Sequence, residues 1–176
     1  MTTSAEDAAP ESASSRRTRF EQLAPWISTV VRLVLGGVLL VAGGLKVIDP
    51  QTSVQAVKAY ELLPDGMARI VGWGLPFVEI GIGVLLILGL LTRAAAIVAG
   101  ILMVAFIAAV ASAAARGLSI DCGCFGGGGQ VAPGQTAYGA EILRDVGLLL
   151  AALWLAWQPR SRYALDHDEE IEENDE

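Results

Sequence analysis

Four apolar stretches constrain most strongly what this chain can fold into. They cover residues 27–45, 70–91, 94–115 and 146–157. About 20 helical residues are needed to cross the hydrocarbon core of a bilayer, so the fourth stretch suffices only if it includes its polar first turns, from Glu141 onward. Helices that are apolar on all sides have no polar face to give to water. We therefore predict an all-α integral membrane protein, a bundle of four helices.

Charge is distributed unevenly along the chain. The formal net charge is −7, and the last sixteen residues alone carry eight acidic side chains and one arginine. Such a segment has too little apolar surface to offset the entropy lost on ordering. We predict disordered cytoplasmic tails over residues 1–25 and 161–176, with a membrane domain over residues 26–160 between them. The near-neutral domain is expected to contact membrane lipid and no nucleic acid.

Lysine and arginine residues beside the apolar stretches predict the orientation. Those on the side of the two termini are Arg16, Arg17, Arg19, Arg93, Arg160 and Arg162, and those on the other side are Lys46, Lys58, Arg69 and Arg116. The positive-inside rule then puts both termini in the cytoplasm and the chain in the cell membrane.

The segment between the first two apolar stretches is predicted to form a short amphipathic helix at the outer interface. The residues that indicate it are Val54, Val57, Tyr60, Leu62 and Leu63.

A pair of cysteines is the most distinctive chemical feature. Cys122 and Cys124 lie two positions apart in a glycine-rich loop, which the orientation above puts outside the cytoplasm. Gly123 between them permits the dihedral angles that bring two sulfurs together. A disulfide in so short a loop is strained, and strained disulfides tend to be labile and catalytic. A redox-active dithiol is therefore favoured over a static disulfide. No metal is predicted, because two cysteines are half a zinc site and the only histidine, His167, lies in the opposite tail.

Charged residues inside the apolar stretches are the other anomaly. A lone charge in hydrocarbon costs a few kcal/mol, so it normally faces a partner or a cavity. Glu79, Asp145 and Lys46 are expected at similar depths on the side of the cysteine loop, whereas Arg32 lies nearer the cytoplasm. Two interpretations remain open for these four residues. They form either a structural ion-pair network or a polar pocket that handles protons or a quinone head group.

Two further expectations concern the surroundings of the thiols. Glu141 and Arg144 are three residues apart on one helix face, so they are expected to neutralise each other. Asp121 disfavours a thiolate in the cysteine pair, whereas a nearby cation favours one. Arg116 and Lys46 are the candidates for that cation.

The chain resembles the DoxX-like and, more closely, the MauE-type membrane protein family over residues 27–158. The motifs that carry the resemblance are Arg32 with Gly36-Gly37, Gly44-Leu45-Lys46, Tyr60-Glu61-Leu62-Leu63-Pro64, Pro76-Phe77-Val78-Glu79 and Cys122-Gly123-Cys124-Phe125-Gly126. The resemblance implies membrane-embedded thiol–disulfide exchange with an extracytoplasmic thioredoxin-fold partner, in the service of methylamine utilisation.

The same resemblance leaves two functions open. In the first, Cys122 and Cys124 are the catalytic residues and a membrane quinone is the candidate electron carrier, as in other four-helix disulfide oxidoreductases. This chain lacks the second cysteine pair that those enzymes use as a relay. In the second, the protein is a non-enzymatic membrane anchor or assembly factor with a structural disulfide.

Overall fold

The fold is mostly helical. The computed structural model describes residues 11–124, 127–132 and 134–158. Its elements in chain order are α1 (Glu11–Ile48), α2 (Pro50–Ala59), α3 (Asp65–Leu88), α4 (Thr92–Ala115), β1 (Ile120–Asp121), β2 (Gly129–Gln130) and α5 (Tyr138–Trp157). Three helical segments, Leu23–Ile48, Asp65–Leu88 and Thr92–Ala115, are long and apolar enough to cross a membrane. The predicted all-helical membrane class is confirmed, with a two-stranded ribbon added to it.

Helix α1 begins earlier than the sequence predicted. It starts at Glu11, so the second part of the predicted disordered tail is helical. Adding turns to an existing helix gains one hydrogen bond per residue without a second nucleation step, which explains the extension. Pro25 lies inside this helix, and its carbonyl accepts a 2.8 Å hydrogen bond from the Thr29 hydroxyl. Residues 1–10 and the acidic tail over residues 161–176 lie outside the described residues, so those predictions stay predictions.

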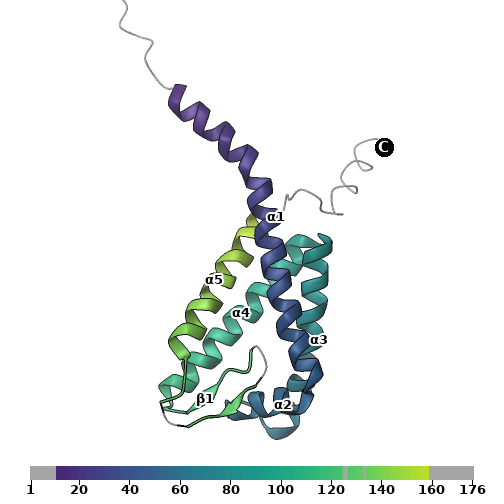
Figure 1. Ribbon diagram of the computed structural model, residues 1–176, viewed down its shortest axis with the longest axis vertical. Helices are drawn as coiled ribbons and strands as arrows, with labels where there is room; N and C mark the ends of the chain where they lie inside the picture. The colour runs from purple at the N-terminus through teal and green to yellow at the C-terminus, as the bar shows by residue number, and fades with distance from the viewer. Residues whose placement is uncertain (1–10, 125–126, 133, 159–176) are drawn as a thin grey trace, which may run out of the picture.

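The long helices α1, α3, α4 and α5 lie side by side (Figure 1), with α1 packed on α3 and α4 packed on α5. Glycines set the closest approach between α1 and α3. A Cβ at Gly36 would lie 3.0 Å from the Gly83 carbonyl, and a Cβ at Gly83 would lie 2.9 Å from the Gly36 carbonyl. Backbone contact of this kind is how helices associate inside a membrane, where burial of apolar surface gives no driving force.

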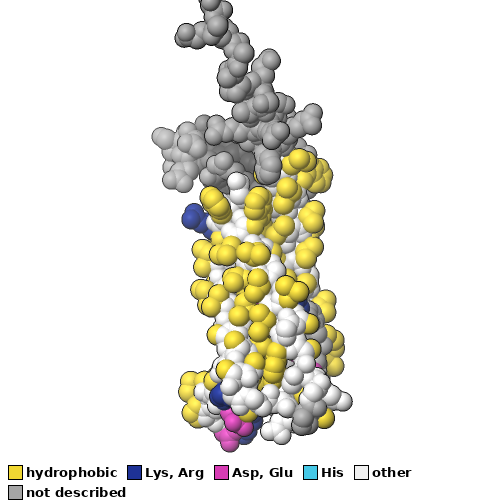
Figure 2. Space-filling model, turned by 90° about the vertical axis from the view of Figure 1, so that its left-hand side faces the viewer, with side chains coloured by type: hydrophobic (Ala, Val, Ile, Leu, Met, Phe, Trp, Pro, Cys, Tyr) yellow, Lys and Arg dark blue, Asp and Glu magenta, His cyan; other side chains and the backbone are white. Residues whose placement is uncertain are grey.

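The distribution of side chains is the reverse of that in a water-soluble protein. A belt of hydrophobic side chains covers the middle of the molecule (Figure 2), and large apolar residues such as Ile70, Phe77 and Ile101 are exposed. Arg32, Glu79 and Asp145, by contrast, are at most 2% exposed. Lipid is the solvent that suits such an exterior, so the fold is that of a membrane protein.

Helix α2 and the β1–β2 ribbon lie at the same end of the molecule (Figure 1). The Asp49 side chain caps α2 by accepting from the Thr52 backbone N–H at 3.2 Å, and the Ser53 hydroxyl ties the helix to the Gly72 carbonyl of α3 at 2.8 Å. A short helix therefore lies where the sequence predicted one, but it ends at Ala59, and the stretch containing Leu62 and Leu63 connects it to α3.

The ribbon positions the cysteine loop. Strands β1 and β2 are antiparallel, with Ile120 opposite Gln130 and Asp121 opposite Gly129. The Tyr138 hydroxyl, at the start of α5, donates to the Leu118 carbonyl at 2.5 Å and accepts from the Ile120 N–H at 3.1 Å. These two bonds hold the entrance to the cysteine loop against the first turn of α5.

Candidate functional site

The cysteine loop begins where β1 ends and folds back over α2. Gly123 has φ +66°, a left-handed conformation that favours glycine. Cβ atoms at Gly123 and Gly128 would lie 2.7 Å and 2.6 Å from the Ala56 methyl of α2, so larger residues would push the loop off the helix. The glycine run is therefore a packing requirement of this loop. It brings the thiols to the end of the helices at which α2 and the ribbon lie (Figure 1).

Cys122 and Cys124 are both free and half-buried. The Cys124 N–H donates to Cys122 Sγ at 3.3 Å, and Cys124 Sγ lies 4.0 Å from the Cys122 carbonyl. Hydrogen bonds from the thiol and N–H of Cys124 lower the pKa of Cys122 to about 7, with a smaller contribution from Arg144. The pKa of Cys124 is raised for three reasons: its thiol is hydrogen-bonded to the Cys122 sulfur, it is buried, and the Cys122 thiolate lies beside it. The pair is electrostatically asymmetric, with Cys122 the better thiolate.

The cation beside the thiols is Arg144, which the sequence did not predict. Its Nη2 lies 3.7 Å from Cys122 Sγ, and its Nε and Nη2 each lie 2.9 Å from Asp145 Oδ1. The sequence led us to expect a pairing of Arg144 with Glu141, whereas the described hydrogen bonds of its guanidinium go to Asp145 and Cys122. The spacing of the two residues allowed the pairing, but α5 packs against the loop and presents the guanidinium to the thiol.

Neither cation proposed from the sequence contacts a thiol through a described hydrogen bond. Arg116 donates to the Tyr60 carbonyl at 2.5 Å and to the Ser112 carbonyl at 3.2 Å, so it links α4 to the end of α2. Lys46 pairs with Glu79 at 2.5 Å, and both side chains are buried. The Lys46 ammonium also lies 5.5 Å from the centre of the Phe106 ring, within the range of a cation–π interaction.

A small cavity, lined mostly by apolar side chains, brings Cys124 together with the buried carboxylates of Glu79 and Asp145. It has a volume of about 20 Å³, and its lining includes Cys124, Arg144, Glu79 and Asp145. Such a volume holds roughly one water molecule. Glu79 Oε2 and Asp145 Oδ2 have no hydrogen-bond partner within the described part of the chain, so both could bond such a water. Arg32 does not line this cavity; it lies in α1, about four turns from Lys46.

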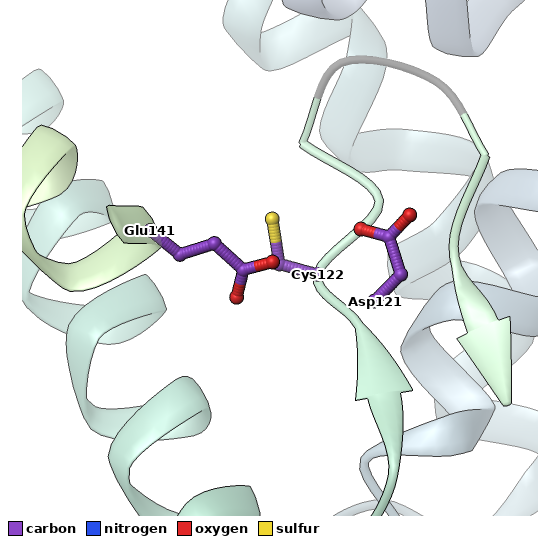
Figure 3. A group of neighbouring side chains, drawn as sticks. All are labelled: Asp121, Cys122 and Glu141. Carbon is purple, nitrogen blue, oxygen red and sulfur yellow. The ribbon is translucent and has the colours of Figure 1, made fainter. Parts of the chain in front are cut away.

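Glu141 is a residue whose proximity to the thiols the sequence did not reveal. It reaches from the first turn of α5 toward Cys122, which follows Asp121 on the neighbouring strand end (Figure 3). One ligand atom from each of these three side chains lies within 4.8 Å of the other two. Asp121 Oδ1 also accepts from the Gly123 N–H at 3.2 Å. The two carboxylates are distant in sequence, so no motif indicates the cluster.

The fold and the site together define a multispanning membrane protein with a thiol pair at one end of its helices. Residues 24–158 match the family model described as "Methylamine utilisation protein MauE", and the chain belongs to the MauE family. It is 38% identical over 134 residues to the methylamine utilization protein MauE of Methylorubrum extorquens, covering 76% of this chain and 70% of that protein. It is 32% identical over 133 residues to the protein of the same name from Paracoccus denitrificans, covering 75% and 69%. No solved structure matches the chain.

Proposed function

We propose that this protein carries out thiol–disulfide exchange at Cys122 and Cys124 on the outer side of the cell membrane. The observation that carries the proposal is the placement of Cys122 Sγ, which receives the Cys124 N–H and lies 3.7 Å from the Arg144 guanidinium. A cation and a donor at this sulfur favour the thiolate, which is the nucleophile in such exchange. Cys124 lies two positions further along the chain and lines the cavity, so it is suited to resolve a mixed disulfide.

The reaction takes two steps. The Cys122 thiolate attacks one sulfur of a disulfide in a thioredoxin-fold partner, which breaks that disulfide, forms a mixed disulfide and releases one thiolate of the partner. Cys124 then loses its proton and attacks Cys122 Sγ, forming the internal disulfide and releasing the partner's second thiolate. Two electrons pass from the cysteine pair to the partner, and the reverse sequence oxidises the partner.

The cavity gives the Cys124 proton a route away from the site. Once Cys122 is in a mixed disulfide, it no longer carries the negative charge that keeps Cys124 protonated. A water in the cavity, or Asp145 and Glu79 on its wall, can then take the proton. In this scheme Lys46 holds Glu79 in place, and Arg32 has a structural role in α1.

A membrane quinone does not fit this cavity. A protein cavity known to bind benzene has a volume of about 150 Å³, whereas this cavity has about 20 Å³. A larger groove of about 330 Å³ lies between α4 and α5, but only apolar side chains and Gly100 line it, and it contains none of the candidate polar residues. We therefore derive no electron-transfer step through a quinone.

The proposed topology has four spans, with α5 crossing beside α1, α3 and α4. The two termini are on the cytoplasmic side, as the arginine distribution favours. The shared location of α2 and the ribbon at one end of the molecule supports an extracytoplasmic cysteine loop with α2 at the interface (Figure 1). By family membership, the process that the exchange serves is methylamine utilisation.

The reduction potential of the cysteine pair tests this function. Full-length protein in detergent is equilibrated with thiol–disulfide buffers of known potential, and the oxidised fraction is measured by thiol alkylation and mass. We expect a potential above about −300 mV, because pairs that exchange with partners lie there. A value well below that limit would mark a structural disulfide and favour the membrane anchor or assembly factor instead.

A further inference from the structure

We propose that Asp121, Cys122 and Glu141 bind a zinc ion, and that zinc at this site blocks thiol–disulfide exchange. The binding stands on geometry alone, whereas the blocking effect rests on the proposed function. The sequence predicted no metal site because it offers only two cysteines and a distant histidine. The folded chain supplies two carboxylates from separate elements in their place.

The ligand types and their spacing suit zinc. Thiolate sulfur binds Zn²⁺ at about 2.3 Å and carboxylate oxygen at about 2.0–2.2 Å. Here the sulfur and the two carboxylate oxygens lie within 4.8 Å of one another, so the ligands have to close by roughly 1 Å around an ion. Gly123 between the two cysteines and the glycine run after Phe125 allow the loop that movement. Asp121 and Cys122 are only half-buried, so water can provide a fourth ligand.

The buried carboxylate of Glu141 points to a ligand independently of the spacing. Glu141 is 8% exposed, it reaches toward Cys122 (Figure 3), and its Oε2 has no hydrogen-bond partner among the described residues. A buried carboxylate oxygen without a partner is costly unless an ion or a water completes its coordination. A zinc ion bound to the Cys122 thiolate would lie close enough to supply the missing partner of the Glu141 carboxylate.

The surrounding charges allow a cation at this position. Arg144 is a positive group beside the site, with Nη2 at 3.7 Å from Cys122 Sγ. Its charge is balanced by Asp145 at 2.9 Å. The Cys122 thiolate and the carboxylates of Asp121 and Glu141 then leave the site with a surplus of negative charge, which favours a divalent cation.

Zinc binding and disulfide formation exclude each other at Cys122. The thiol gives up its proton to solvent when its sulfur coordinates zinc, and the coordinated sulfur is not free to attack a disulfide. An internal Cys122–Cys124 disulfide has no thiolate left to bind the metal. Zinc therefore holds the pair reduced and idle until it is removed, with no net transfer of electrons.

Cobalt serves as a spectroscopic probe for the site. Reduced full-length protein in detergent, freed of any histidine tag, is titrated with Co²⁺, and the thiolate-to-cobalt charge-transfer absorption is followed and then displaced by Zn²⁺. We expect one Co²⁺ per chain. We expect Glu141→Gln to weaken binding at least tenfold and Cys122→Ser to abolish the charge-transfer band. Absence of the band in the native protein, or an unchanged affinity in Glu141→Gln, would overturn the site.

Cys124→Ser is the matched control, because Cys124 is outside the proposed ligand set. It should keep the cobalt spectrum while losing the ability to form an internal disulfide, which separates failure of the metal site from failure of the exchange. Asp121→Asn provides a second ligand variant if Glu141→Gln does not fold, and it should also weaken Co²⁺ binding. Saturating Zn²⁺ should slow alkylation of Cys122 in Cys124→Ser at least tenfold, and an unchanged rate would contradict the blocking effect.

Discussion

Arg144 Nη2 lies 3.7 Å from Cys122 Sγ, while the same guanidinium is paired with Asp145. A charged side chain of α5 thereby links the cysteine loop to the carboxylates buried among the helices. A helix that only anchored the loop would not need a cation at this point. The arrangement assigns Arg144 as a positioning residue for the Cys122 thiolate.

Replacement of Arg144 tests that assignment. Arg144→Gln removes a charge that favours the thiolate, so we expect Cys122 alkylation at pH 7 to slow several-fold and its pKa to rise. Arg116→Gln is the matched control, because Arg116 binds the Tyr60 carbonyl and no described hydrogen bond joins it to a thiol. Equal rates in the native protein and Arg144→Gln would show that the guanidinium has no effect on the sulfur.

The pH dependence of alkylation tests the asymmetry of the pair. The pKa of Cys122 is lowered to about 7 and that of Cys124 is raised, so Cys122 should react first and alone. Its rate should fall as the pH drops through 7, since protonation removes the thiolate, and should level off above pH 8. The measurement uses reduced protein with a metal chelator and locates the label by mass. Preferential labelling of Cys124 would contradict the asymmetry.

The Lys46–Glu79 pair should make a large contribution to stability. Glu79→Gln leaves a buried ammonium without its counter-charge, and breaking a buried ion pair costs about 3–5 kcal/mol. We expect a markedly lower unfolding midpoint in detergent. Lys46→Met combined with Glu79→Met removes both charges and should recover much of the loss. A double variant no more stable than Glu79→Gln would argue that the pair is not the cause.

Close packing of α1 on α3 depends on Gly83. A Cβ there would lie 2.9 Å from the Gly36 carbonyl, so Gly83→Ala should force the helices apart and lower the unfolding midpoint by several degrees. Gly81 is two residues away on the same helix, and a Cβ there would meet nothing within 4 Å. Gly81→Ala should therefore be neutral or slightly stabilising. Similar losses in the two variants would mean that intrinsic helix effects, rather than packing, explain the result.

Hydropathy and charge are sufficient to predict the membrane class and to single out the buried charged residues Lys46, Glu79 and Asp145. A charged residue such as Glu79 stands out in an apolar stretch, because burying a charge in hydrocarbon is costly whatever the exact bounds of the helix. Lys46, at the end of the first stretch, is expected at a depth similar to that of Glu79, so the two side chains can meet. These inferences need only helix geometry and the polarity of the surroundings.

The contacts made by the loop could not be predicted in this way. Whether Arg144 faces Glu141 or a thiol depends on how α5 packs against the loop, and helical spacing is compatible with either. The cluster of Asp121 and Glu141 around Cys122 joins two elements distant in sequence, so no local pattern reveals it. The start of α1 at Glu11 was also missed, since composition alone does not show that the span nucleates further turns.

The central claim is that Cys122 attacks a disulfide and Cys124 resolves the adduct, and glutathione disulfide tests it most directly. Reduced full-length protein is treated with this probe under chelator, quenched with acid and weighed as intact chains. We predict that the native protein forms the internal disulfide, that Cys124→Ser accumulates one glutathione on Cys122, and that Cys122→Ser reacts at least tenfold more slowly. A native protein that stops at the glutathione adduct, or a Cys122→Ser variant that reacts as fast as Cys124→Ser, would contradict the account.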